Sequence, residues 1–296
     1  MSAVRVLERV ARHAALGLRF WDIATGSDAI DGLFVEIVSR ANPRARTVAH
    51  PNRNGVYVAH GVPGLRDFEF DDGDSADVWS AATRAYHVEV RDPRERFLPV
   101  SFDADLPMRG LFTWRAAWLS PPQPIAFPRA PGSPPQLMLE RVPLFSTPSR
   151  PVPEPLGVVY AQLREQGSDR DAAWSLLGVL IDGVDRGLGL SDPSGRVAVM
   201  FPYPEPPRIS LASPPEEKND FTWKISLNVY RSAVSPQTKA PAIADLADVF
   251  SSLTAPRDVI ESDNSPAPPL RLTYREPLTV RTAGRVGSDA SYLFFS

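Results

Sequence analysis

Apolar and polar residues alternate with a period of two along much of the chain, in short stretches separated by Gly, Pro, Asn and Asp. Such alternation is typical of half-buried β-strands joined by turns. In the first part of the sequence it predicts strands at residues 18–21, 33–38, 56–60, 67–70, 86–90 and 97–100. The pattern then predicts strands at residues 158–163, 173–181, 196–201, 221–230, 270–274, 278–281 and 292–295.

Turns and helices are indicated at few places. Asn54-Gly55 and Asp182-Gly183 favour hairpin turns. Gly187-Leu188-Gly189 also predicts a hairpin, because no helix of a phosphate-binding loop follows it. Residues 2–15 predict a helix with one apolar and one arginine-rich face, which suits packing or docking better than a membrane surface. Residues 241–253 predict a second helix that begins near a proline.

Proline accounts for 32 of the 296 residues, about twice the usual share. Because proline is unfavourable inside helices and central strands, a helical bundle and a large doubly wound α/β enzyme are disfavoured. The densest stretch, residues 121–155, predicts a semi-rigid extended linker. The expected fold class is therefore mainly β, with two small β-sandwich domains joined by this linker and a C-terminal α+β segment.

Residues 54–64 and 192–204 resemble each other weakly, since each has a polar turn, a strand and a proline-containing turn. This similarity indicates that one type of sandwich occurs twice. The predicted organisation is an N-terminal helix or arm, a first sandwich, the linker, a second sandwich-like repeat and a C-terminal docking region, at residues 1–16, 17–120, 121–155, 156–207 and 208–296.

Composition narrows the class of function. The formal net charge of −3 gives no basic footprint, so nucleic acid is not an expected partner. The absence of cysteine excludes disulfides, thiolate metal sites and cysteine nucleophiles, and it fits a cytoplasmic location. No apolar run approaches 18 residues, so no membrane span is expected. The arginine-rich first 20 residues lack the apolar stretch of a signal peptide.

The search for reactive groups yields no catalytic, cofactor-binding or metal-ligating residue. The four histidines, His13, His50, His60 and His87, are not tied by any motif to a serine or to one another, so we interpret them as structural or surface residues. Residues 67–77 form an acidic segment with oxygen ligands that suit calcium, but the EF-hand spacing fails and a solvated loop is favoured. A hydrolase with a scattered serine site remains an alternative of another class.

Trp114 and Trp118 lie four residues apart and therefore share a face of a helix or a strand. Buried or interfacial packing is the favoured interpretation. If these indoles are exposed, they could stack on sugars or anchor a protein partner, which is the basis of a second hypothesis, a carbohydrate- or peptide-binding module.

The motifs Asp22-Ile23-Ala24-Thr25-Gly26, Gly32-Leu33-Phe34-Val35, Gly55-Val56-Tyr57-Val58 and Val62-Pro63-Gly64 follow one another at the spacing of a known family. Residues 17–105 thereby resemble the carboxypeptidase-regulatory-like, or transthyretin-like, β-sandwich domain. Residues 192–199 match it more loosely. The resemblance implies two transthyretin/Ig-like sandwiches without catalytic residues, and no peptidase domain accompanies them.

Four further segments carry a wider resemblance: residues 63–70 (PGLRDFEF), 96–100 (RFLPV), 144–153 (LFSTPSRPVP) and 195–204 (GRVAVMFPYP). They look like segments of proteins from gene clusters for extracellular, phage-tail-like contractile injection systems. This implies a structural part of the particle, first the cap or cap adaptor at the sheath–tube end and second a baseplate or spike accessory. The implied partners are sheath, inner tube, cap or baseplate subunits, together with further copies of the chain in a six-fold ring.

Overall fold

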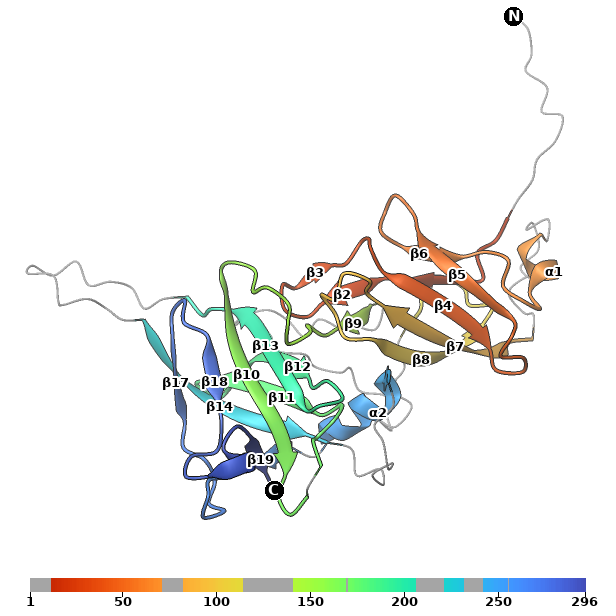
Figure 1. Cartoon of the computed structure of the whole chain (residues 1–296). Coiled ribbons are helices and arrows are strands. Elements are labelled where there is room, and N and C mark those ends of the chain that lie inside the picture. Colours follow the sequence, from red (N-terminus) through yellow and green to blue (C-terminus); the bar gives the residue numbers. More distant parts are fainter. Residues whose placement is uncertain are drawn as a thin grey trace, which may run out of the picture.

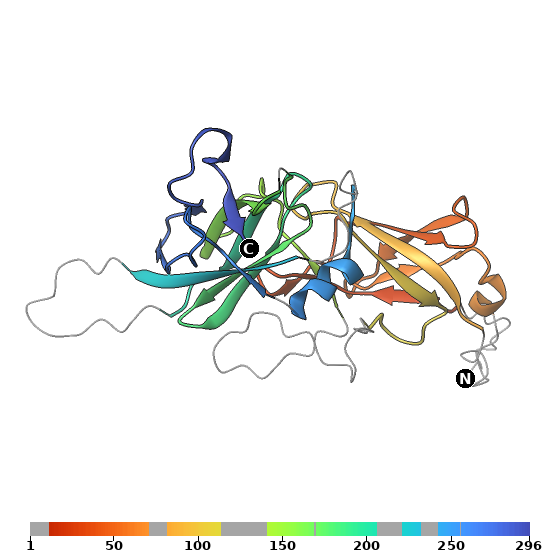
Figure 2. The same ribbon diagram turned by 90° about the horizontal axis from the view of Figure 1, so that it is seen from below.

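The computed structural model describes residues 12–70, 82–113, 141–168, 170–205, 221–231, 242–254 and 256–296. These residues form two β-sandwich lobes that lie side by side (Figures 1 and 2). The expected mainly β fold class is confirmed, with a small α+β element in the C-terminal part of the chain.

The large sheet of the first lobe has the strand order β1-β6-β5-β4-β7-β8-β15. Alternate side chains of its strands are buried, for example Val35 and Ile37 in β4 and Tyr86, Val88 and Val90 in β7, as the period of two requires. The bounds are β1 Leu16–Leu18, β4 Phe34–Ser39, β5 Arg46–Pro51, β6 Tyr57–Ala59, β7 Arg84–Arg91, β8 Val100–Leu106 and β15 Ala244–Asp245.

The second sheet of this lobe is short and contains part of the proline-rich segment. It has the order β3-β2-β9, with β2 at Phe20–Asp22, β3 at Ser27–Asp28 and β9 at Val142–Leu144. The chain after β9 pairs with residues 96–98, since Leu98 N–H donates to Phe145 O at 2.9 Å. Residues 121–140 of the predicted linker lie outside the described ranges, whereas Val142, Leu144 and Phe145 belong to the buried core.

The second lobe also consists of two facing sheets. One has the order β13-β10-β18, with β19 pairing farther along β10, and the other has the order β12-β11-β14-β16, with β17 pairing elsewhere on β14. A separate hydrophobic core lies between them. The bounds are β10 Leu156–Glu165, β11 Leu176–Ile181, β12 Val184–Leu190, β13 Arg196–Pro202, β14 Thr222–Tyr230, β16 Pro256–Asp258, β17 Leu270–Thr273, β18 Leu278–Val280 and β19 Leu293–Phe295. Strands from 156–207 and from 208–296 therefore share both sheets.

One segment of the C-terminal part crosses to the first lobe. β15 pairs in parallel with β8, and Ala244 N–H donates to Pro99 O at 3.2 Å. Helix α2 (Leu246–Ser251) follows and buries Leu246, Val249 and Phe250 in the first core. Asp245 caps α2 by accepting the N–H of Ala247 at 2.8 Å. The predicted helix over 241–253 is thus present but shorter, and it continues into the 3₁₀ turn η3 (Ser252–Thr254).

Three local predictions have clear outcomes. The hairpin at Asp182-Gly183 is confirmed, since both residues have the positive φ (52° and 74°) of a tight β-turn between β11 and β12. The strand over 67–70 is wrong, because Arg66–Glu69 forms the short helix α1. The hairpin at residues 187–189 is also wrong, because these residues lie inside β12, where a Cβ on Gly189 would come within 2.8 Å of Ala198 O.

Two further segments complete the described chain. The predicted helix over residues 2–15 lies mostly outside the described residues, and residues 12–14 have no regular secondary structure. Between β18 and β19, the 3₁₀ turn η4 (Gly287–Asp289) precedes the C-terminal strand.

Candidate functional site

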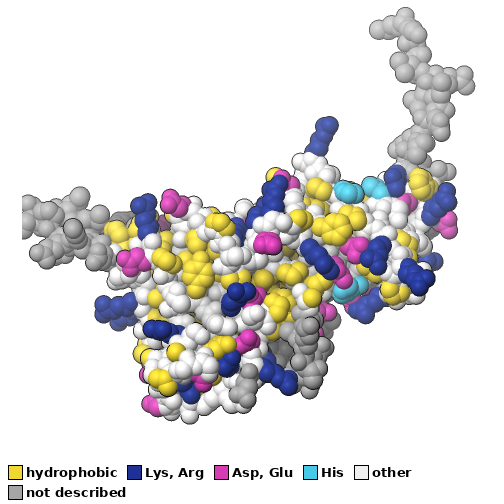
Figure 3. Space-filling model, viewed as in Figure 1, with side chains coloured by type: hydrophobic (Ala, Val, Ile, Leu, Met, Phe, Trp, Pro, Cys, Tyr) yellow, Lys and Arg dark blue, Asp and Glu magenta, His cyan; other side chains and the backbone are white. Residues whose placement is uncertain are grey.

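The histidines lie apart on the first lobe, where Figure 3 shows those that reach the visible surface in cyan. His13 packs its ring against Phe68 with 6.0 Å between centroids, and His87 Nδ1 lies 2.8 Å from Asp103 Oδ1 on the neighbouring strand. His50 is exposed on β5, and His60 follows β6. Over the described part of the chain, no three His, Asp or Glu side chains are grouped so that they could hold a metal ion.

The acidic segment is only partly visible. Residues 71–77 lie outside the described ranges, whereas Asp67 and Glu69 belong to α1. Glu69 is buried and accepts the N–H of Val62 at 2.9 Å and a guanidinium N–H of Arg12 at 3.3 Å. These two bonds give Glu69 a structural role in fixing the turn before α1.

Trp114 and Trp118 lie outside the described residues, but an aromatic cluster that the sequence analysis missed lies on the second lobe. The rings of Tyr203 and Trp223 are stacked with 5.3 Å between centroids, and Tyr274 meets Tyr203 edge-on at 4.8 Å. Arg275 adopts a positive φ of 63° and donates its backbone N–H to Tyr203 Oη at 2.9 Å. We call Tyr203, Trp223, Tyr274 and the neighbouring Phe221 the aromatic cluster; all four are half-buried at one end of the second core.

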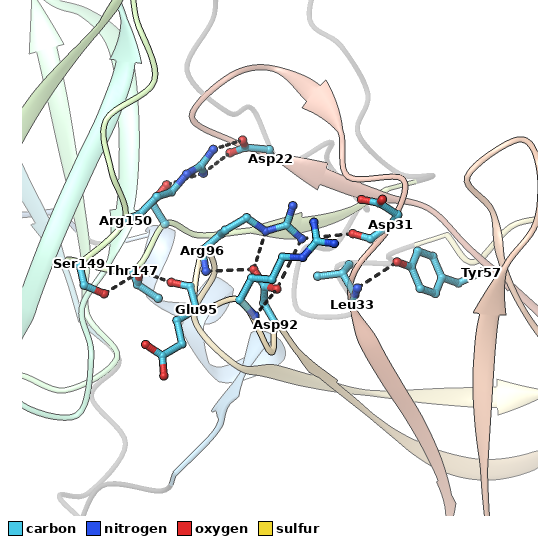
Figure 4. A network of polar contacts seen from close by, with 12 residues as sticks. Asp22, Asp31, Leu33, Tyr57, Asp92, Glu95, Arg96, Thr147, Ser149 and Arg150 are labelled. Atoms are coloured by element: carbon cyan, nitrogen blue, oxygen red, sulfur yellow. Dashed lines mark hydrogen bonds and ion pairs between the residues drawn. The ribbon is translucent and has the colours of Figure 1, made fainter.

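A polar network lies in the first lobe next to the short sheet and fixes the segment that leads from β9 to the second lobe (Figure 4). Arg150 makes a paired contact with the Asp22 carboxylate, at 2.7 Å from Nη2 and 3.1 Å from Nη1. Its Nη1 also donates to Ser146 Oγ at 2.9 Å, and its guanidinium lies 4.9 Å from the ring centroid of Phe97. Both charged side chains are nearly buried, with 10% of Arg150 and 7% of Asp22 exposed.

The Asp22 carboxylate accepts two more hydrogen bonds from its own turn. Ala24 N–H lies 3.0 Å from Oδ1, and the hydroxyl of Thr25 lies 2.9 Å from Oδ2. The Asp-x-x-Thr-Gly turn predicted at residues 22–26 is therefore held from both sides, by local bonds and by Arg150.

A second turn of the network is built around Asp92 (Figure 4). Its buried carboxylate accepts the backbone N–H groups of Arg94 and Arg96, each at 3.0 Å, and the Arg96 Nε–H at 2.8 Å. Burial alone would raise the pKa of Asp92, but these bonds, led by the Arg96 side chain, outweigh it and lower the pKa. Arg96 also donates to Asp31 O at 3.2 Å and thereby ties this turn to the loop before β4.

Apolar contacts complete the junction between the lobes. Leu176, Leu188 and Leu190 of the second lobe belong to the same buried cluster as the first core. In a second, smaller cluster, Ala24 packs with Val158, Ala198 and Met200 of β10 and β13. Buried side chains of both lobes therefore pack together at the junction in two clusters, while the main core of the second lobe is separate.

Outside the junction, hydrophobic and charged side chains are interspersed over the visible face (Figure 3). Of the helices in the described ranges, none is long and apolar enough to cross a membrane. Comparison of the chain with family models, with curated proteins and with solved structures finds no match.

Proposed function

We propose that the chain is a non-enzymatic structural subunit of a phage-tail-like contractile injection system, placed at the cap or as cap adaptor at the sheath–tube end. A baseplate or spike accessory role in the same machine is the alternative position. In this proposal the chain assembles in the cytoplasm with sheath and inner tube subunits, and copies of it form a six-fold ring.

The observation that carries the proposal is the junction between the lobes. The first core extends into the second lobe, and the buried Arg150–Asp22 pair fixes the connecting segment to the first lobe. The two lobes then act as one stiff body, which suits a part that must hold neighbouring subunits at a set spacing. An independently hinged pair of binding modules would instead have a small and polar interface.

Three of the four segments that carry the wider resemblance, residues 96–100, 144–153 and 195–204, lie at or near this junction, whereas residues 63–70 lie around α1, at the end of the first lobe away from the second lobe (Figure 1). Residues 96–98 pair with 145–147, since Thr147 N–H donates to Arg96 O at 3.0 Å. Met200 of the 195–204 segment packs in the cluster around Ala24. These three segments therefore include residues that set the arrangement of the lobes, which supports an architectural role.

Co-assembly tests the proposal directly. The purified full chain is mixed with sheath and inner tube proteins and analysed by size-exclusion chromatography with light scattering. We expect co-migration and, for the chain alone or with tube, the mass of a ring of six. A compact monomer that elutes apart from both partners would overturn the proposal. The chain with Arg196→Met, which changes a side chain that is 62% exposed and paired only with Asp192, serves as a matched control for Arg150→Met.

The second candidate, a carbohydrate- or peptide-binding module, is favoured by the aromatic cluster. Half-buried Tyr and Trp rings with a neighbouring arginine are typical of surfaces that stack on sugars or peptide side chains. A glycan array separates the two candidates: Trp223→Ala would abolish a signal that comes from the aromatic cluster, whereas Trp114→Ala and Trp118→Ala would abolish one from the predicted tryptophan pair. An array without any signal removes this candidate.

A further inference from the structure

One edge of strand β14 is left open in its middle. β11 pairs with β14 along residues 225–230 on one side. On the other side, β16 pairs with residues 228–230 and β17 pairs with residues 222–225. Ser226 and Leu227 therefore have no strand partner on this side among the described residues. Because the polar groups of successive residues in a strand point to opposite edges, one of the two directs its N–H and C=O into the gap.

The sequence explains why the gap stays open. After Asp258 the chain leaves β14, and Ile260 N–H donates to Phe294 O at 3.0 Å, so this stretch joins β19 instead. It then turns back as a small hairpin in which Ala267 N–H donates to Val259 O at 2.8 Å. Pro268 and Pro269 precede β17 and lack N–H groups, so they cannot extend the ladder toward Ser226.

A cavity of about 210 Å³ lies at this gap. Its floor is aliphatic and buried, and it is formed by Ile225, Leu227, Val259, Ile260, Val280 and Leu293. Its rim holds polar groups of both signs, with the exposed Asp258 and Arg281 and the half-buried Glu261. The cavity thus combines an apolar floor, a polar rim and an unpaired strand edge, which together are the parts of a binding site.

The size of the cavity limits what it can bind. Pockets for drug-sized molecules have volumes of roughly 300–1,000 Å³, and a cavity of about 150 Å³ holds benzene. The volume here lies between them and is enough for one apolar side chain of leucine size or larger, and the open edge can hydrogen-bond to a peptide main chain. We propose that this cavity binds one apolar side chain of a peptide, whose main chain at that residue hydrogen-bonds to the unpaired residue of β14 in the gap.

This proposal does not depend on the contractile-system role, because it concerns the binding of a peptide of any origin. It is tested with the full chain, labelled at Ile, Leu and Val methyl groups, and two probes, N-acetyl-leucine N-methylamide and N-acetyl-glycine N-methylamide. We expect the leucine probe to shift methyl signals of the cavity floor and to bind about tenfold or more tightly than the glycine probe. Equal affinity for both probes, or shifts spread over both lobes, would overturn the proposal.

Matched variants show where the probe binds. Ala267→Leu places a larger side chain in the cavity lining and should abolish the methyl shifts while the remaining spectrum keeps its folded pattern. Ala290→Leu changes another half-buried alanine of the same lobe that does not line the cavity, and it should leave binding unchanged. If Ala267→Leu misfolds, Val280→Phe provides a second cavity-filling variant. Undiminished binding to a folded cavity-filled variant would refute the site.

Discussion

Replacing Arg150 with methionine is expected to lower the free energy of unfolding by about 3 kcal/mol. Methionine keeps the unbranched apolar stem of the side chain but removes both bonds to Asp22 and the bond to Ser146. Removal of one partner from a buried ion pair costs about 3–5 kcal/mol, because the other charge remains buried without compensation. The lower end of this energy range applies to Arg150→Met, because the Asp22 carboxylate keeps its hydrogen bonds from Ala24 and Thr25.

Urea unfolding at neutral pH measures this effect. Tryptophan fluorescence reports on both lobes, because Trp21 lies in β2 and Trp223 in β14. The buried contacts between the lobes predict one transition for the unmodified chain, and far-UV circular dichroism should give the same midpoint. Arg196→Met is the matched control, because Arg196 forms the same type of contact with Asp192 but its side chain is 62% exposed, so a loss below about 1 kcal/mol is expected.

A double-mutant cycle isolates the pair itself. Asp22→Asn alone leaves the Arg150 cation nearly buried, and Arg150→Met alone leaves the carboxylate, whereas the double variant removes both charges. The double variant should therefore lose less stability than the sum of the two single losses, by about 1–3 kcal/mol. If Arg150→Met destabilises the chain no more than Arg196→Met does, the buried pair does not stabilise the segment that connects the lobes and our reasoning fails.

Three further predictions test neighbouring features. The pKa of Asp92 is lowered from its reference value of 3.8 in the folded chain, so its carboxylate stabilises the fold at neutral pH and this stabilisation is lost on acidification. In urea unfolding at several pH values, the free energy of unfolding should therefore fall less steeply below about pH 4 for Asp92→Asn than for the unmodified chain. If the free energies of the two proteins fall in parallel with pH, this prediction is wrong. Gly195→Ala should cost about 1–3 kcal/mol, seen as a lower Tm, because Gly195 has a φ of 74° and a Cβ there would lie 2.7 Å from Leu163 O. Phe250→Ala should cost about 3–5 kcal/mol in urea unfolding, and a loss below 1 kcal/mol would mean that α2 contributes little to the first core.

The strands were predictable where only one face of a sheet is buried. In β7 and β14 the buried and exposed positions alternate, so the period of two is visible in the sequence. Residues 67–70 alternate in the same way, but residues 67–69 lie in α1 and Phe70 follows it. Their pattern arises from tertiary contacts, since Phe68 packs in the first core and Glu69 bonds to Val62 and Arg12. A stretch this short cannot distinguish the two cases.

The pairing of distant segments had no local signal. β2 pairs with β9 across more than a hundred residues, β8 pairs with β15, and β10 pairs with both β18 and β19, all of them in parallel. Parallel pairs have no connecting hairpin, so no turn motif marks them in the sequence. The aromatic cluster escaped sequence analysis for the same reason, because Tyr203, Trp223 and Tyr274 come from three separate segments.

The five-residue turns show where local prediction ends. In the turns that begin at Asn52 and at Asp192, the first side chain accepts the N–H groups two and four residues later, and a glycine with a φ of 72° or 74° occupies the fourth position. The weak repeat in the sequence therefore reflects one turn geometry. Its surroundings differ, because the first turn joins β5 to β6 in one sheet and the second joins β12 to β13 across two sheets.

The turn that begins at Asp92 extends this comparison. It has the same Asp-Pro-x-x-Arg sequence as the turn at Asp192 and the same bonds from carboxylate to backbone and arginine. Arg96 is only 31% exposed and reaches Asp31 O, however, whereas Arg196 is 62% exposed. Five residues therefore determine the geometry of the turn. Contacts from distant segments determine which of the two arginines takes part in the polar network beside the junction. For this reason the arrangement of the lobes could be established only from the folded chain.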